Sequence, residues 1–311
     1  DIRCLLGRSN PCSFRRLQVH IAPDGAPMTR IQRYLSLIKF EHTIFALPFA
    51  LISLLVASGG RPSWRVLLWV LVAMVGARSA AMAFNRLADA KIDAANPRTA
   101  DRHIPAGTVS VFGAGVFVVL SAALLVLAAW MLNPLCFKLS PFALLVVLGY
   151  SYMKRVSAMA HLVLGLGLGI APIGAWLAVT GEFAPFPLWL AAGVMFWVAG
   201  FDTIYACQDV DFDRRTGLHS LASRLGVGRA LNLSRVFHFL AVVFLAVAMR
   251  NEPQLGWVSF AGVLIMAVLL AWEQAIVRGG DMERIDKAFF EINSWIGMVL
   301  LGAVLFDLYL L

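Results

Sequence analysis

Long apolar segments recur along the whole chain, separated by short polar loops. A run of roughly 20 apolar residues is the length at which a helix crosses the ~30 Å hydrocarbon core of a bilayer. Because the backbone finds no water there, a spanning segment must be a helix or part of a closed barrel, and continuous hydrophobicity selects helices. The pattern predicts an all-α polytopic membrane protein with nine spans. They lie near residues 40–58, 65–88, 112–132, 139–153, 160–180, 186–208, 231–249, 255–275 and 290–311.

The composition agrees, since 60% of the 311 residues are hydrophobic, 14% are charged and the mean hydropathy is +0.79. The net charge of +8 does not indicate a nucleic-acid partner, because the charges lie in loops, where Lys and Arg set membrane orientation. These residues divide 11 to 4 between alternate loops, which predicts that the amino end and the richer loops face the cytoplasm of a bacterial inner membrane or its equivalent. The larger group is Arg98, Arg102, Lys154, Arg155, Arg214, Arg215, Arg224, Arg229, Arg278, Arg284 and Lys287, and the smaller is Arg61, Arg65, Lys138 and Arg250.

The first 27 residues contain no apolar stretch of the kind found in signal peptides. We expect residues 1–27 to be a disordered leader or an artefact of the start site, and residues 28–311 to form one membrane domain. No soluble domain or long linker interrupts that second part.

Two of the loops on the positively charged side follow helix ends that carry aspartates at helical spacing. Asn85, Asp89 and Asp93 end the second span at steps of four, and four residues advance a helix by about 400°, so the three side chains share one face. A similar set ends the sixth span, 120 residues further on. This spacing predicts two related four-helix halves followed by a ninth helix. The second set is Asp202, Tyr205, Asp209 and Asp213.

Carboxylates in such positions need compensation. A charge inside a membrane span costs about 2.5 to 3.5 kcal/mol on the insertion scale, and like charges one turn apart repel each other. Mg²⁺ accepts carboxylate and amide oxygens and completes its shell with water and substrate phosphates. The two sets therefore predict a diphosphate bridged by metal. A single aspartate at a helix end, such as Asp307, is more simply a solvated terminus.

Basic side chains lie next to both sets. Arg98 and Arg102 follow the first set in PRTADR, and Lys154 and Arg155 end the fourth span in YSYMKR. Such side chains hold phosphate oxygens, although an orientation signal explains any one of them equally well. For His161, near a span end, we expect an ordinary hydrogen-bonded histidine at the membrane interface.

Four segments together resemble the UbiA superfamily of intramembrane aromatic prenyltransferases over residues 30–311. They are NRLADAKID, NPRTADRHIPAG, YSYMKR and DTIYACQDVDFDRRTGLHSLASRLG. The resemblance implies nine helices around a central cavity that is capped on the cytoplasmic side and open laterally to lipid. It also implies transfer of a prenyl group from a polyprenyl diphosphate to an aromatic acceptor with Mg²⁺. Carried over by position, it implies that Asn85, Asp89 and Asp93 bind one Mg²⁺ and that Asp209 and Asp213 bind a second.

The resemblance also implies roles for the remaining polar residues. Lys154, with Arg98 or Arg102, is expected to hold diphosphate oxygens. Arg155 is the candidate for a carboxylate on the acceptor. Asp202 and Tyr205 are the candidates for orienting or deprotonating its phenol.

The segments NPRTADRHIPAG and GLHSLASRLG are most similar to those of enzymes that prenylate 4-hydroxybenzoate in ubiquinone synthesis. The alternative acceptor is a 1,4-dihydroxy-6-naphthoate in menaquinone synthesis. From another class, a cation-coupled transporter also places carboxylates in a helical bundle, but near the membrane midplane. The predicted partners are a polyprenyl diphosphate, a small aromatic acid and membrane lipid, with no obligate protein partner.

Overall fold

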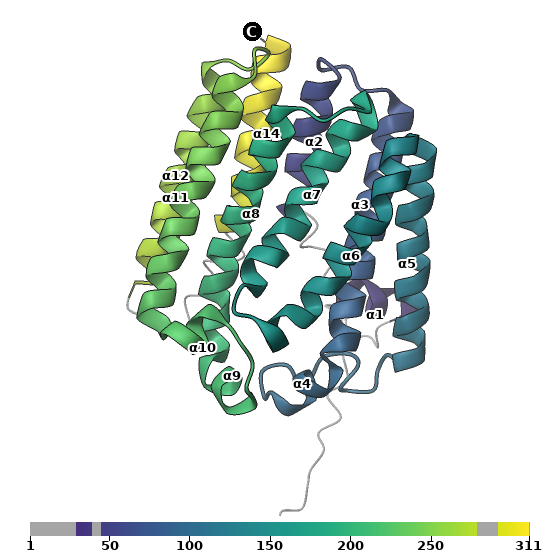
Figure 1. Ribbon diagram of the computed structural model, residues 1–311, viewed down its shortest axis with the longest axis vertical. Helices are drawn as coiled ribbons and strands as arrows, with labels where there is room; N and C mark the ends of the chain where they lie inside the picture. Colours follow the sequence, from purple (N-terminus) through teal and green to yellow (C-terminus); the bar gives the residue numbers. More distant parts are fainter. Residues whose placement is uncertain (1–28, 39–44, 279–291, 311) are drawn as a thin grey trace, which may run out of the picture.

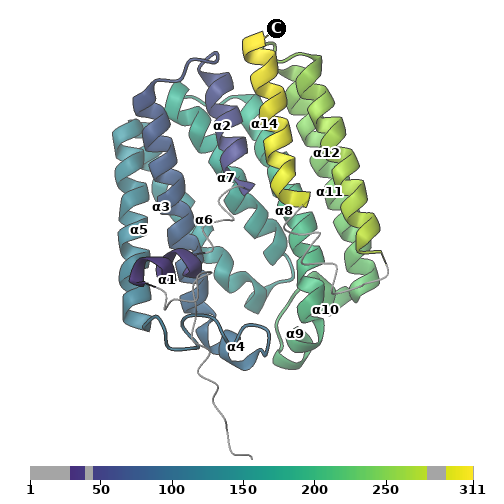
Figure 2. The ribbon, with the colours of Figure 1, turned by 180° about the vertical axis from the view of Figure 1, so that it is seen from behind.

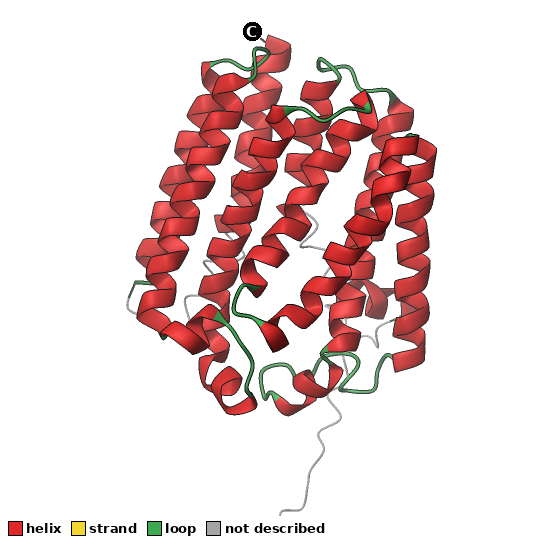
Figure 3. Cartoon of the chain, in the orientation of Figure 1, coloured by secondary structure: helices red, strands yellow, loops and turns green. Residues whose placement is uncertain are grey.

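The computed structural model describes residues 29–38, 45–278 and 292–310. The described residues form helices and loops and contain no strand (Figure 3). The predicted leader, residues 1–27, and the basic residues Arg284 and Lys287 lie outside them. The helices are α1 (Arg30–Leu37), α2 (Leu47–Ala57), α3 (Trp64–Ala88), α4 (Ala90–Ala95), α5 (Val111–Leu132), α6 (Pro134–Val156), α7 (Ala160–Thr180), α8 (Pro185–Ala206), the 3-10 turn η2 (Cys207–Asp209), α9 (Val210–Thr216), α10 (Leu221–Leu225), α11 (Val227–Asn251), α12 (Trp257–Ile276) and α14 (Asn293–Leu310).

The prediction of an all-α membrane bundle is confirmed. In the described part of the chain, eight helical segments are long and apolar enough to cross a bilayer. The first predicted span, 40–58, differs, because its described part is helical only over the 11 residues of α2. A helix of that length rises only about 16 Å, roughly half the hydrocarbon thickness. The fourth span is longer than predicted, since α6 has 23 residues.

The order of the helices fits two halves and one addition. Helices α2, α3, α5 and α6 are followed by α7, α8, α11 and α12, and α14 then packs between α2 and α12. Helix α3 packs on α5, as α8 packs on α11, and the halves meet where α7 contacts α2 and α6 (Figures 1 and 2). The short helices α4, α9 and α10 gather at the end of the bundle opposite the last residues of the chain.

Glycines allow close contact between α7 and α8. A Cβ on Gly165 would lie 2.2 Å from the carbonyl oxygen of Met195, and one on Gly169 would lie 2.8 Å from that of Ala191. Small residues are the usual means by which helices approach inside a membrane, where the hydrophobic effect does not drive helix association. These two helices therefore hold a fixed spacing.

Helix α8 is also tied to its neighbours by buried hydrogen bonds. Trp197 Nε1 donates to Asn293 Oδ1 at 2.7 Å, and Asn293 Nδ2 donates to Glu273 Oε1 at 2.7 Å. Ser234 Oγ donates to the carbonyl of Gly200 at 2.8 Å. Polar contacts of this kind join helices in lipid, so α11, α12 and α14 together fix the position of α8.

The expectation that Asp307 is a solvated terminus is wrong. Its side chain is buried, and Oδ2 accepts hydrogen bonds from the backbone N–H groups of Gly256 at 3.0 Å and Ser259 at 2.7 Å. These donors lie at the start of α12, where backbone N–H groups have no partner within the helix. Asp307 of α14 therefore caps α12 from a neighbouring helix, which the spacing along the chain did not indicate.

Candidate active site

The two acidic sets line one cavity. The helix ends that carry them lie at the end of the bundle where α4, α9 and α10 gather (Figure 1). The cavity has a volume of about 420 Å³. Side chains 120 residues apart in the sequence thus face the same space. Its lining includes Asn85, Asp89 and Asp93 from the first set and Asp202, Tyr205, Asp209 and Asp213 from the second.

In both sets the central aspartate stands at a break in the helix. Asp89 separates α3 from α4 with φ −92° and ψ 5°, and Asp209 precedes α9 with φ −104° and ψ 9°. This backbone region is sparsely populated and is often used at active sites. Around Asp89 the helical hydrogen bonds continue, from Asp89 N to Asn85 O at 2.9 Å and from Asp93 N to Asp89 O at 2.7 Å. Asn85, Asp89 and Asp93 therefore share one face, as predicted, although the helix breaks at Asp89, which the spacing did not indicate.

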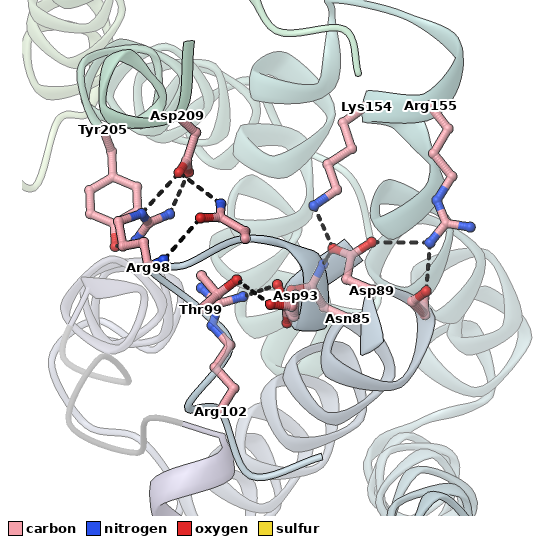
Figure 4. Close-up of polar contacts among 12 residues, drawn as sticks. Asn85, Asp89, Asp93, Arg98, Thr99, Arg102, Lys154, Arg155, Tyr205 and Asp209 are labelled. Atoms are coloured by element: carbon pink, nitrogen blue, oxygen red, sulfur yellow. Dashed lines mark hydrogen bonds and ion pairs between the residues drawn. The ribbon is translucent and has the colours of Figure 1, made fainter. Parts of the chain in front are cut away.

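Asp89 is buried and is held by two cations from the end of α6. Lys154 Nζ lies 2.6 Å from Asp89 Oδ2, and Arg155 Nη2 lies 3.1 Å from Oδ1 (Figure 4). Asn85 Nδ2 donates to Oδ2 at 3.2 Å, and Arg155 also donates to the carbonyl of Ala88 at 2.5 Å. A buried carboxylate needs such partners, because an unpaired charge away from water is strongly destabilising.

Asp93 is held on one side only. Arg102 Nη1 donates to its Oδ1 at 2.7 Å, and Thr99 Oγ1 donates to its backbone carbonyl at 3.1 Å. The other carboxylate oxygen, Oδ2, is buried and has no hydrogen-bond partner in the described part of the chain. A buried acceptor without a partner is unusual and calls for a ligand or an ion.

Asp209 is reached from the other half of the molecule. Arg98 Nε donates to Asp209 Oδ1 at 3.0 Å and its Nη2 pairs with Oδ2, while Asn96 Nδ2 donates to Oδ1 at 3.1 Å. Arg98 Nη1 also donates to the Tyr205 hydroxyl at 2.9 Å (Figure 4). Burial lowers the pKa of the Arg98 guanidinium, but its hydrogen bonds to Asp209 and the nearby charges outweigh burial, so that the pKa is raised. The loop after α4 thus joins the two acidic sets.

Asp202, one turn before Tyr205, has a different partner. Its Oδ2 lies 2.7 Å from Nδ1 of His161, in the first turn of α7. His161 is hydrogen-bonded, as expected, and it is buried, with 4% of its surface exposed. Asp213 lines the cavity beyond Asp209.

Two arginines and a tyrosine in the cavity wall were not predicted as site residues. Arg78 and Arg86 lie on α3, two turns apart, and Tyr150 lies on α6. Arg78 and Tyr150 also line a second cavity of about 380 Å³ between α3, α5, α6 and α7, most of whose lining is apolar. An arginine inside the predicted span 65–88 is itself an indication of function, because membrane spans rarely carry one without a role.

Arg155 lies beside the cavity, at the end of α6. Its guanidinium binds Asp89 and the carbonyl of Ala88, and it is absent from the residues that line the cavity. The neighbouring Lys154 does line it. Arg78 and Arg86 line the cavity and are therefore further candidates for binding an anionic group there.

The oxygen donors suit magnesium. Among the described residues, no three His, Cys, Asp or Glu side chains are close enough to form a metal cage. Mg²⁺ does not require one, because it is commonly held by one or two carboxylates together with water and substrate phosphates. Carboxylates on two walls, the amide of Asn85 and the unpartnered Oδ2 of Asp93 supply that donor set.

A family model for the UbiA prenyltransferase family matches residues 46–295, which lie inside the predicted domain 28–311. The chain belongs to the UbiA prenyltransferase family. This membership confirms the predicted enzyme class and gives no support to the transporter alternative.

Relatives in the UbiA family cover nearly the same length. The chain is 34% identical over 259 residues to the 4-hydroxybenzoate octaprenyltransferase of Vibrio campbellii, covering 81% of this chain and 88% of that protein. It is 32% identical over 285 residues to the enzyme of the same name from Albidiferax ferrireducens, covering 89% and 94%.

Solved UbiA structures share the fold. The apo structure of a UbiA homolog from Aeropyrum pernix K1 is 33% identical with a TM-score of 0.79, covering 86% of this chain and 98% of that one. A UbiA homolog from Archaeoglobus fulgidus bound to DMAPP and Mg²⁺ is 19% identical with a TM-score of 0.67, covering 88% and 99%, and supports the fold alone.

Proposed function

We propose that this protein transfers a polyprenyl group from a polyprenyl diphosphate to 4-hydroxybenzoate in ubiquinone biosynthesis. The observation that carries the proposal is that two cavities of different kinds lie side by side and share part of their walls. Acidic and basic side chains line the first, and mostly apolar side chains line the second. The two share the wall residues Arg78, Met82, Tyr150, Leu164 and Leu168. A substrate with a charged head and a long hydrocarbon tail has the same two parts. The names of the relatives support the choice of 4-hydroxybenzoate.

The donor's diphosphate would lie between the two acidic sets. Asn85, Asp89 and Asp93 would hold one Mg²⁺, and Asp209 and Asp213 a second. When bound, the metal neutralises the negative charge that grows on the diphosphate as its bond to the allylic carbon breaks. The Archaeoglobus homolog was solved with DMAPP and Mg²⁺ bound, and membership of the same family supports the use of this metal here.

Basic side chains at the same rim would complete the diphosphate site. Lys154, Arg98 and Arg102 each contact one of the carboxylates and so stand within reach of the same ligand. Their positive charges stabilise the leaving group more in the transition state than in the ground state. We propose that Arg155 serves this site indirectly by holding Asp89.

The tail would run past Arg78 into the apolar cavity. A helical bundle lined by Leu, Val, Ala and Met side chains excludes water, which would otherwise capture the allylic cation.

The acceptor would enter the polar cavity with its carboxylate toward Arg78 and Arg86 and its hydroxyl toward Asp202. A guanidinium binds a carboxylate with two parallel hydrogen bonds and so fixes the ring in one orientation. Asp202 would take the phenol proton, and Tyr205 would orient the hydroxyl. The oxygen then pushes electron density into the ring carbon beside it, which attacks the allylic carbon.

The excess of basic residues at this end of the bundle supports an active site facing the cytoplasm of a bacterial inner membrane. Among described residues, Arg98, Arg102, Lys154 and Arg155 lie here, whereas Arg61, in the loop between α2 and α3, and Arg250, in the last turn of α11, lie at the opposite end of the bundle.

The test supplies membranes containing the protein with labelled polyprenyl diphosphate, Mg²⁺ and either 4-hydroxybenzoate or 1,4-dihydroxy-6-naphthoate. Prenylated 4-hydroxybenzoate that disappears with a magnesium chelator is the expected result. Prenylation of the naphthoate alone would reassign the acceptor while keeping the reaction class. The proposal would be refuted if membranes containing the wild-type protein formed no prenylated aromatic product, as expected for membranes containing Asp89→Ala.

A further inference from the structure

His161 is a buried side chain that the proposed reaction has not used. Nδ1 lies 2.7 Å from Asp202 Oδ2, and the backbone N–H of Leu221 donates to Nε2 at 3.3 Å. Because Nε2 accepts a hydrogen bond, the ring proton lies on Nδ1 and is donated to the carboxylate. The imidazole is thus held at both nitrogens, between α8 and the first residue of α10.

This contact leaves Asp202 with one committed oxygen and one available oxygen. Oδ2 is bound by His161, whereas Oδ1 has no hydrogen-bond partner among the described residues. The carboxylate lines the cavity, and 25% of its side chain is exposed. Fixing one oxygen stops rotation of the carboxylate and leaves the other able to accept a proton.

The segment that contacts His161 also contacts the end of α6. The backbone N–H of His219 donates to the carbonyl of Lys154 at 2.7 Å, two residues before Leu221. Leu218, His219 and Ser220 of this segment also line the cavity. One short segment therefore reaches both the helix end that carries Lys154 and the histidine behind Asp202.

We propose that His161 is a positioning residue, which holds Asp202 so that its free oxygen receives the phenol proton of the aromatic acceptor. The inference rests on the proposed function. In the step it serves, the O–H proton passes to Asp202 Oδ1, and the carbon–carbon bond forms as the bond to diphosphate breaks. The displaced ring proton then leaves and the oxygen is protonated again, so the net products are prenylated acceptor, diphosphate and one proton.

The test compares His161→Ala with His161→Gln on two acceptors. Alanine removes the hydrogen-bond donor to Asp202, and we expect kcat with 4-hydroxybenzoate to fall about 10- to 100-fold, less than the roughly 10²- to 10⁴-fold expected for losing the general base itself. Glutamine carries both a donor and an acceptor, as the neutral imidazole does, and should restore kcat to within about threefold. The second acceptor, 3-fluoro-4-hydroxybenzoate, has a more acidic phenol and keeps one free ring position beside it. The ratio of wild-type to His161→Ala kcat should be smaller for this acceptor.

Two controls separate positioning from damage to the fold. Release of diphosphate from the polyprenyl donor without acceptor needs the metal site but not Asp202, and it should be the same in wild type and His161→Ala. Thr180→Ala, at the exposed far end of α7, tests substitution in the same helix and should leave both rates unchanged. If His161→Ala does not insert, His161→Met removes the donor while filling more of the space.

The proposal is wrong if His161→Ala prenylates 4-hydroxybenzoate at the wild-type rate. It is also wrong if both acceptors lose kcat by the same factor, because the histidine then acts on something other than phenol deprotonation. A wild-type protein that prenylates neither acceptor overturns the proposed function instead, and the two failures are thereby distinguished.

Discussion

The two acidic sets have similar backbones but different surroundings. Asp89 and Asp209 stand at equivalent helix breaks, 120 residues apart. Asp89 is 1% exposed and is held by cations from α6, whereas 20% of the Asp209 side chain is exposed and its arginine comes from the other half. A repeated backbone has thus been placed against two different sets of partners.

The residues that do not repeat are more informative. Asp202 has Met82 at the position 120 residues earlier, and Arg78 has Val198 at the position 120 residues later. These unmatched polar residues both line the cavity, and under the proposed function both serve the acceptor. Under the same proposal the repeated aspartates serve the diphosphate. Under the proposed function, the residues that repeat in the two halves bind the polyprenyl diphosphate, and the residues that do not repeat bind the aromatic acceptor.

The largest expected effect comes from removing a repeated carboxylate. Asp89→Ala and Asp209→Ala should each lower prenyl transfer by about 10³-fold, because loss of one group that stabilises developing charge costs about that much. Release of diphosphate without acceptor should fall in parallel, since both sets act on the donor. Liquid chromatography of labelled products measures both rates. If either variant kept its donor reaction, that half would not belong to the metal site.

A smaller and more selective effect is expected at Asp202. Asp202→Asn should lower transfer to 4-hydroxybenzoate by about 10²- to 10⁴-fold, the range for a general base. Release of diphosphate without acceptor should stay at the wild-type level. Measuring the two rates on the same preparation separates this residue from Asp209, seven positions later. A parallel loss of both rates would place Asp202 with the repeated set.

Substitution of Arg78 should separate binding of the acceptor from binding of the polyprenyl diphosphate. Arg78→Met should raise KM for 4-hydroxybenzoate about 10- to 100-fold, since a hydrogen bond to a charged group contributes about 1.5 to 3 kcal/mol. KM for the polyprenyl diphosphate should change little. The matched variant is Arg155→Met, which is expected to affect the donor through Asp89. If Arg155→Met raised KM for the acceptor instead, the original expectation for that residue would hold.

The sequence predicted the parts of the fold and site that depend on local periodicity. Apolar runs located the long helices, and steps of four placed Asn85, Asp89 and Asp93 on one face. The 11-residue length of α2 was missed because flanking apolar residues have the same composition as a span. Arg78 and His161 were missed for a related reason. Their roles depend on contacts across helices, and a single arginine or histidine in an apolar run shows no spacing that reveals such contacts.

The smallest expected effect on catalysis is at Asp307, a buried aspartate outside the cavity. Asp307 is buried, as Asp89 and Asp93 are, but it caps α12 away from the cavity. Asp307→Ala should lower the free energy of unfolding by about 0.5 to 2 kcal/mol, the usual loss for a helix cap. The lower midpoint of thermal unfolding in detergent would show this, while kcat at a temperature well below that midpoint should match wild type. Asp307→Asn keeps one side-chain oxygen that can accept from Gly256 and Ser259, so it should recover most of the stability. A loss of kcat without a loss of stability would show that burial of an aspartate in this fold has consequences for the reaction even outside the two acidic sets.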